Sequence, residues 1–184
     1  MGDHVAELCE RAKSGELAAA SELVTLFYER IFAYFRRLCG NDEDAADLTQ
    51  RAFSKAWSSL ASFDHRASFN TWLHRIAHNT YVDWRRKGNR FDGQSDDWWE
   101  TCESDEPSPF ENAAEREIAH QLYALVEQLD EEQRQPVHLH YYQGLSLQET
   151  ADALNIAKST VKYRLRNALD FLRSQTAEPK LRTR

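Results

Sequence analysis

Apolar side chains recur every three or four residues over most of the chain, which is the spacing of amphipathic helices. Between residues 16 and 39, for example, Leu23, Leu26, Phe27 and Ile31 fall on one face of a helix. No stretch alternates apolar and polar residues convincingly in the manner of a β-strand. The pattern therefore predicts an all-α protein. Six predicted helices cover residues 3–13, 16–39, 69–87, 116–129, 147–154 and 158–174. Two further helices are predicted, one from residue 42 to the loop at residues 62–68 and one from residue 130 to Gly144.

Residues 91–115 break the helical pattern and divide the chain in two. This segment contains Pro107 and Pro109, nine acidic residues and no basic residue. Such a composition favours a flexible acidic linker. We therefore predict two small helical domains, residues 1–90 and 116–184, joined by this linker.

The chain has 184 residues, and 30 aspartates and glutamates outnumber 23 lysines and arginines to give a formal net charge of -7. A net negative charge argues against general affinity for nucleic acid. The surplus of acid lies mainly in the linker, however. Residues 22–90 hold 11 basic and 8 acidic side chains, and residues 116–184 hold 10 basic and 9 acidic ones. Both domains can therefore bind phosphate through local basic patches.

The amino-terminal residues lack the pattern of a signal peptide, and no apolar run is long enough to span a bilayer. The three cysteines, Cys9, Cys39 and Cys102, are scattered and form no C-x-x-C pair. This usage is typical of reduced thiols in the cytosol. We therefore expect a cytoplasmic protein without membrane insertion.

Residues 147–165 carry the pattern of a helix-turn-helix. Ala151 is small where the two helices must cross, and Asn155, four residues later, tolerates the left-handed backbone of the turn. Apolar residues that lock the second helix onto the first follow at the required spacing. They are Leu154, Ile156, Val161 and Leu165. The pattern predicts a DNA-binding motif without specifying the class of DNA-binding protein.

Because the apolar residues of the second helix face inward, helical geometry determines which of its residues face outward. Its side chains are polar or basic, which suits hydrogen bonds to base edges and contacts to phosphates. The face holds Ser159, Tyr163, Arg166 and Asn167, with Lys162 and Arg164 on its flanks.

In the first half, Arg75, Asn79, Val82 and Arg86 share one flank of the helix predicted over residues 69–87. The loop before this helix, residues 63–69, mixes aromatic, basic and polar side chains. Such a mixture suits single-stranded nucleic acid, because bases can stack and insert between the side chains.

In their order and separation these motifs resemble those of the extracytoplasmic-function (ECF) sigma factors, the smallest members of the sigma-70 family. The stretch from Asp47 to Trp57, DLTQRAFSKAW, is similar to the family's polymerase-binding helix. The stretch from Phe69 to Thr80, FNTWLHRIAHNT, is similar to its promoter-melting segment. The helix-turn-helix resembles its segment for the upstream -35 element. The resemblance covers nearly the whole chain.

The resemblance implies a non-enzymatic subunit, without cofactor or metal, that directs core RNA polymerase to promoter DNA and promotes melting. It implies contacts from Asp47, Gln50 and Phe53 to the coiled coil of the polymerase's largest subunit. Contacts to the -10 element, including a flipped base, are implied for Phe63, Asp64, His65, Arg66, Ser68, Arg75, Asn79 and Arg86. Contacts to the -35 element are implied for Ser159, Thr160, Lys162, Tyr163, Arg164, Arg166 and Asn167. A sequestering anti-sigma protein and a linker lying in the polymerase cleft are implied as well.

The chain departs from the family pattern at three places. Arg51 stands where the family usually has glutamate after the glutamine of the polymerase-binding helix. Leu129 and Asp130 replace a usual Leu-Pro pair, and Asn155 replaces a commoner glycine. The first departure concerns the details of the polymerase contact, whereas the other two are structurally tolerable.

Three other interpretations account for parts of the sequence. A zinc enzyme could use His74 and His78, four residues apart on one helix, but the stretch lacks the glutamate of a metalloprotease motif and no third ligand follows. A helix-turn-helix regulator that is not a sigma subunit, such as a response regulator, would need a βα receiver domain in the first half. A helical adaptor that does not bind DNA is the third.

Overall fold

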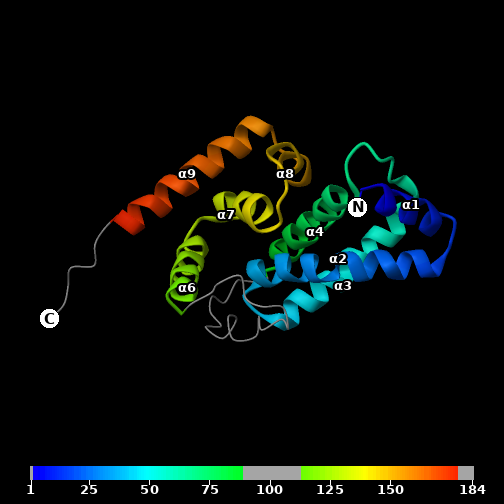
Figure 1. The fold of residues 1–184 in the computed structure, drawn as a ribbon, viewed down its shortest axis with the longest axis horizontal. Helices are drawn as coiled ribbons and strands as arrows, with labels where there is room; N and C mark the ends of the chain where they lie inside the picture. Colours follow the sequence, from blue (N-terminus) through cyan, green and yellow to red (C-terminus); the bar gives the residue numbers. More distant parts are fainter. Residues whose placement is uncertain (1, 89–112, 178–184) are drawn as a thin grey trace.

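The computed structural model describes residues 2–88 and 113–177, and every regular element in these two ranges is helical (Figure 1). The predicted all-α class is confirmed. The elements are α1 (Gly2–Lys13), α2 (Leu17–Cys39), α3 (Asp42–Ser59), the 3-10 turn η1 (Leu60–Ser62), α4 (Phe69–Arg86), α6 (Ala113–Glu127), α7 (Glu131–Val137), the π-helical segment η2 (His138–Tyr142), α8 (Leu147–Leu154) and α9 (Lys158–Ala177).

Three long helices, α2, α3 and α4, form the core of the first domain, and α1 packs against α2. The predicted apolar face of α2 is buried with one exception, since Leu26 is 42% exposed. Leu26 lies about 100° around the helix from Phe27, which faces the core. The largest fully buried side chains of this domain are Leu8, Leu23, Ile31, Tyr34, Phe35, Leu38, Leu48, Leu73, His74 and Tyr81.

The second domain holds the predicted helix-turn-helix in α8 and α9. The Ser146 side chain accepts a hydrogen bond from the Glu149 backbone, and the Glu149 side chain accepts one from the Ser146 backbone, so a capping box starts α8. Asn155 ends it with a φ of 54°, in the left-handed region, as predicted. The core of this motif consists of Val126, Leu129, Val137, Ala151, Val161, Leu165, Ala168 and Leu172.

One predicted boundary near the start of this domain needs revision. Helix α6 begins at Ala113, so residues 113–115 of the predicted linker are helical, while residues 91–112 lie outside the described residues. Pro136 lies inside α7. In the structure α7 passes directly into the π-helical η2, whose wider turn accommodates a local break in the hydrogen-bond ladder.

The two domains pack on each other and share part of one core. Four apolar side chains of the second domain, Leu139, Leu145, Ala153 and Leu154, join the buried cluster of the first. Helix α8 lies against α4, which Figure 1 shows as the gold and green helices. This domain contact buries the apolar side of α8 and η2 together with one face of α4.

Histidines lie within or beside this contact. The His74 ring is fully buried, meets Tyr34 edge-on at 5.8 Å between centroids, and has Nδ1 2.9 Å from the Asn70 carbonyl oxygen. Burial lowers the pKa of His74 to about 4, with nearby Arg30 adding to the effect while Asn70 and Gln143 oppose it. Burial, helped by the positive charge of Arg164, also lowers the pKa of His78 to about 4.

His138 of η2 is likewise fully buried, and burial lowers its pKa although Glu127 opposes the shift. The ring of Tyr142 lies 5.3 Å from the His138 ring, and Arg37 and Arg134 add positive charge nearby. All three histidines are therefore neutral at pH 7 in the folded chain.

Acidification should weaken the fold through these histidines. Their pKa values lie below the ordinary 6.5, so the folded chain binds fewer protons than the unfolded chain. The stability they support is complete above about pH 6.5 and is lost as the pH falls toward 4, by at most about 1.4 kcal/mol per pH unit for each histidine.

Urea unfolding at pH 7 and pH 5 measures the loss. We expect it to be smaller in the double variant His74→Leu, His78→Leu and unchanged in the exposed control His4→Gln. If the stability of the double variant depended on pH as that of the wild type does, groups other than His74 and His78 would be responsible for the loss.

Candidate nucleic-acid interface

The outward face of α9 is open to solvent as predicted. Ser159, Lys162, Tyr163 and Arg166 are exposed, Tyr163 to 56%. The Arg166 guanidinium lies 5.8 Å from the centre of the Tyr163 ring, close enough for a cation–π contact. This contact restricts the arginine before any ligand binds, and it leaves the guanidinium donors available for a base edge or a phosphate.

Other members of the same predicted set are less accessible. Arg164 donates from Nη2 to the Glu132 carboxylate at 2.6 Å, and its side chain is 24% exposed. It therefore ties α9 to α7. Thr160 and Asn167 are half-buried on the sides of the helix. The exposed part of the predicted set is thus centred on Tyr163 and Arg166.

The predicted flank of α4 is also present. Arg75, Asn79 and Arg86 are exposed along it, and Val82 is half-buried beside them. One end of this flank meets the second domain, because Arg75 Nη2 lies 3.5 Å from the Asn155 side-chain oxygen. Asn79 keeps both of its hydrogen-bonding groups toward solvent.

The loop that precedes α4 begins with a buried aromatic residue. Phe63 is only 4% exposed, with its ring centroid 5.0 Å from Trp72 and 5.8 Å from Phe69, and Lys13 Nζ donates to its carbonyl oxygen at 2.6 Å. The aromatic ring of Phe63 therefore belongs to the core in this conformation, and its contact with DNA stays a prediction. The side chain helps to hold the shape of the loop.

The remaining loop residues are at the surface. Asp64 and Arg66 are exposed and paired at 3.0 Å. His65 has a φ of 59°, in the left-handed region, and its Nε2 lies 2.6 Å from the Glu10 carboxylate. A contact with α1 thus supports an unusual backbone at the tip of the loop.

Helix α8 contacts the end of this loop through Glu149. The Glu149 carboxylate accepts hydrogen bonds from the Thr71 hydroxyl at 3.1 Å and from the Ser68 hydroxyl at 3.4 Å. Hydrogen bonds from Ser146, Thr71 and Ser68 lower the pKa of Glu149, so it is ionised at neutral pH. In this conformation the helix-turn-helix therefore contacts Ser68, which remains exposed, and the outward face of α9 is open as well.

The residues predicted to bind polymerase lie on α3 with different exposures. Gln50 is exposed, whereas Asp47 is half-buried and paired with Arg51 at 2.8 Å. Phe53 is 6% exposed, and its ring stacks on Tyr28 with centroids 6.4 Å apart. Gln50 is thus the accessible member of the set, and Phe53 contributes mainly to packing.

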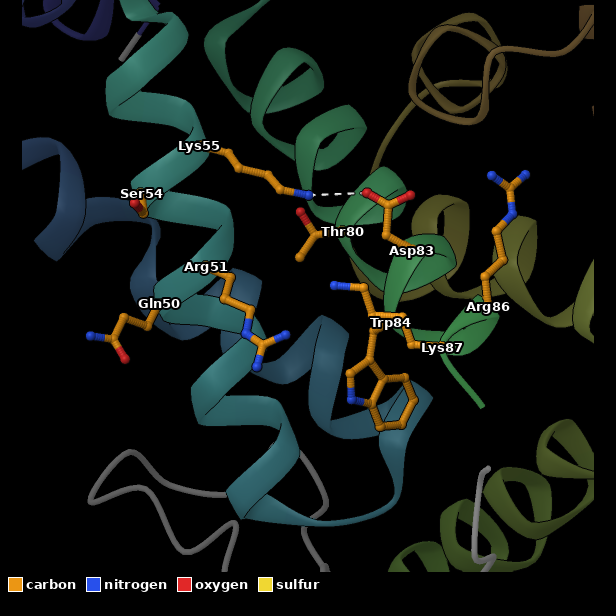
Figure 2. Close-up of a pocket in the computed structure, with 9 residues that line it drawn as sticks. All are labelled: Gln50, Arg51, Ser54, Lys55, Thr80, Asp83, Trp84, Arg86 and Lys87. Atoms are coloured by element: carbon orange, nitrogen blue, oxygen red, sulfur yellow. Dashed lines mark hydrogen bonds and ion pairs between the residues drawn. The ribbon is translucent and has the colours of Figure 1, made fainter. Parts of the chain in front are cut away.

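A groove between α3 and the end of α4 was not predicted. Its volume is about 640 Å³, and Figure 2 shows its lining residues. They are Gln50, Arg51, Ser54, Lys55, Thr80, Asp83, Trp84, Arg86 and Lys87. The i, i+4 spacing of Arg51 and Lys55 places them on one face of a helix, but helical periodicity does not indicate which neighbouring helix they meet.

A metal centre finds no support in the part of the chain that the structure describes. No group of three or more histidine, cysteine or acidic side chains is arranged there to hold an ion. His74 lies in the core against Tyr34. Within the described ranges, no helix is long and apolar enough to span a membrane.

Comparison with known proteins matches one family model to each half of the chain. The family model Sigma-70 region 2 matches residues 23–91, and the model Sigma-70, region 4 matches residues 119–172. The chain is 28% identical to the ECF RNA polymerase sigma factor SigW of Bacillus subtilis over 180 residues, which cover 90% of this chain and 93% of SigW. It is 30% identical to SigX of the same organism, with 82% and 80% covered.

A solved structure supports the fold. The sigma factor RpoE of Bartonella quintana, in complex with the anti-sigma factor NepR, superimposes with a TM-score of 0.65 at 21% identity, covering 86% of this chain and 98% of that one. Both domains are matched in order, and relatives of this type match over most of their length. The chain therefore belongs to the ECF family of RNA polymerase sigma factors.

Proposed function

We propose that this chain binds core RNA polymerase, directs it to specific promoters and promotes the melting of promoter DNA. The observation that carries the proposal is the presence of both sigma domains in order on one chain, each with an exposed polar or basic helix face. Helix α4 presents Asn79 and Arg86 on one domain, and α9 presents Tyr163 and Arg166 on the other.

The proposal assigns a separate task to each segment. Residues 1–90 bind polymerase and the -10 element, residues 116–184 bind the -35 element, and residues 91–115 connect them. The exposed Gln50 supports the polymerase assignment on α3. Two half-exposed ion pairs, Arg51–Asp47 on α3 and Lys55–Asp83 between α3 and α4, support contact with charged partners. Each of these pairs can be replaced by an ion pair with a partner at little cost in free energy.

The same proposal makes the chain a non-catalytic subunit that works in the cytoplasm, where polymerase and chromosomal DNA are found. It also includes an anti-sigma protein as a regulator. The similarity to a sigma factor solved with its anti-sigma factor supports this partner.

Reconstitution tests the function directly. Core polymerase, the purified chain and a library of random promoter fragments are incubated with nucleotides, and the transcripts are sequenced. A sigma factor yields transcripts that start downstream of a shared pair of elements. A helix-turn-helix regulator that is not a sigma subunit would bind DNA without core and would give no start sites with core alone.

Gln50→Ala should weaken assembly with core polymerase. Gln50 is exposed on α3, so its removal deletes a possible hydrogen bond without opening a cavity in the core. Competition against a labelled sigma factor for core measures the affinity, and we expect a loss of about 0.5–1.5 kcal/mol. The control is Gln175→Ala, an exposed glutamine at the end of α9. Equal competition by the folded Gln50 variant and the wild type would refute the assignment.

Arg166→Ala and Asn79→Ala should separate the tasks of the two domains. Arg166→Ala should weaken binding of the closed promoter and relax preference in the upstream element, with about 1–3 kcal/mol of lost discrimination. Asn79→Ala should leave closed binding nearly intact and reduce promoter opening, because its amide can both donate to and accept from an extruded base.

Binding to closed promoter and permanganate footprinting of the melted region distinguish these two effects. Wild-type opening by the Asn79 variant would overturn the division of labour while leaving the sigma-factor function intact. Loss of all binding by either variant, with a normal circular dichroism spectrum, would show that the two elements are not read separately.

A further inference from the structure

The last residue of α1 is a lysine that reaches across to the loop at residues 63–68, which Figure 1 shows beside α1. Lys13 Nζ donates to the Phe63 carbonyl oxygen at 2.6 Å, fifty residues further along the chain, and to the Glu10 carboxylate at 2.7 Å. The same Nζ lies 3.3 Å from His65 Nε2. The Lys13 side chain is only 19% exposed, although lysine side chains mostly stay in water. The ammonium therefore joins α1 to the start of the loop.

Glu10 extends this contact to the tip of the loop. The carboxylate oxygen that accepts from Lys13 also lies 2.6 Å from His65 Nε2. Hydrogen bonds from Lys13 and then from His65 lower the pKa of Glu10, so the carboxylate is ionised at neutral pH. A neutral imidazole can carry its proton on Nε2, so the contact does not require a charged His65. We call Lys13, Glu10 and His65 the loop clamp.

The clamp joins a fixed helix to an unusual loop backbone. Leu8 and Cys9, directly before Glu10, are fully buried in the core, so the end of α1 is held in place. At the other end of the clamp, His65 has a φ of 59°. A residue other than glycine is uncommon in this left-handed region and persists where its surroundings hold it there. The clamp supplies such a support from outside the loop.

Contacts within the loop shape its tip without fixing it to the domain. The Asp64 carboxylate lies 3.0 Å from the Arg66 guanidinium and accepts from the Arg66 backbone N–H at 3.2 Å. Both side chains are exposed, and exposed pairs of this kind are weak. The contacts from α1 therefore determine where the exposed side chains of the tip are held.

We propose that Lys13 and Glu10 are positioning residues, which hold the loop at residues 63–68 in the conformation that accepts an extruded base of the -10 element. The inference rests on the proposed function, because it presumes that this loop and Asn79 hold such a base. It adds a task for α1, which precedes the residues 23–91 that match the Sigma-70 region 2 model. A loop that is already ordered loses less conformational freedom when the strand binds, which raises the affinity.

The first arm of the test uses holoenzyme assembled from core polymerase and the full chain. One probe is a fluorescein-labelled single strand with the -10 element of a promoter recovered by reconstitution. A second probe lacks the one base whose removal weakens wild-type binding most. Lys13→Gln should bind the complete strand about tenfold less tightly, as for the loss of one charge-assisted hydrogen bond, and this loss should disappear on the abasic strand. Arg173→Gln, an exposed arginine on α9, controls for the loss of a positive charge.

The second arm uses Glu10, for which the clamp and simple electrostatics predict opposite signs. Glu10→Ala removes an acid, so reduced repulsion of DNA alone would tighten binding. The clamp predicts weaker binding of the complete strand, because Lys13 and His65 lose the carboxylate that they share. The matched control is Glu7→Ala, which removes the same charge from an exposed glutamate on α1 that faces Arg11.

Three results would overturn the proposal. They are unchanged binding by Lys13→Gln, equal losses by this variant on the complete and abasic strands, and tighter binding by Glu10→Ala. Equal losses would indicate a general folding defect or a direct phosphate contact, because neither depends on the base. Glu10 is exposed, so its variant decides the question even where Lys13→Gln fails to fold. If the wild-type holoenzyme bound neither probe, or bound both equally well, the proposed function itself would be contradicted, and the role of the clamp with it.

Discussion

The burial of Leu139, Leu145 and Leu154 against the first domain is the interaction on which the rest of the described conformation depends. Each leucine removed from water stabilises the contact by about 1.5–3 kcal/mol. This apolar contact holds α8 against α4, and it thereby brings Glu149 to Ser68 and Thr71. The polar contacts between the domains depend on the apolar contact, because exposed or half-exposed hydrogen bonds of this kind are too weak to hold the domains together by themselves.

The domain contact has unequal consequences for the two faces that we propose to bind DNA. Ser68 and Arg75 both meet the helix-turn-helix, so the start of α4 is partly covered. Tyr163 and Arg166 point away from the contact and remain exposed. The described conformation is therefore compatible with a ligand on the outward face of α9. Ser68 and Arg75 also remain exposed although each has one polar contact with the second domain.

Local signals in the sequence were sufficient to predict the helices and the helix-turn-helix. The left-handed Asn155 and the helix starting at Phe69 were predictable because each depends on neighbours within a few residues. Phe63, Arg164 and the basic groove were not predictable in this way. Phe63 is buried by Trp72 and Phe69, Arg164 is held by Glu132, and the groove needs two helices side by side. Each depends on tertiary packing, which amphipathic periodicity does not encode.

Local charge, and not net charge, determines how this chain can meet DNA. The field of an exposed charge decays over about 8 Å at physiological salt, so acids elsewhere in the chain have little influence on a basic groove. Within the groove, Asp83 pairs with Lys55 but leaves Arg86 and Lys87 uncompensated. The same reasoning applies to α9, where Glu132 neutralises Arg164 and leaves Arg166 available. Intramolecular ion pairs thus select which cations can bind phosphate, and a charge of -7 for the whole chain is consistent with the two proposed DNA-binding faces.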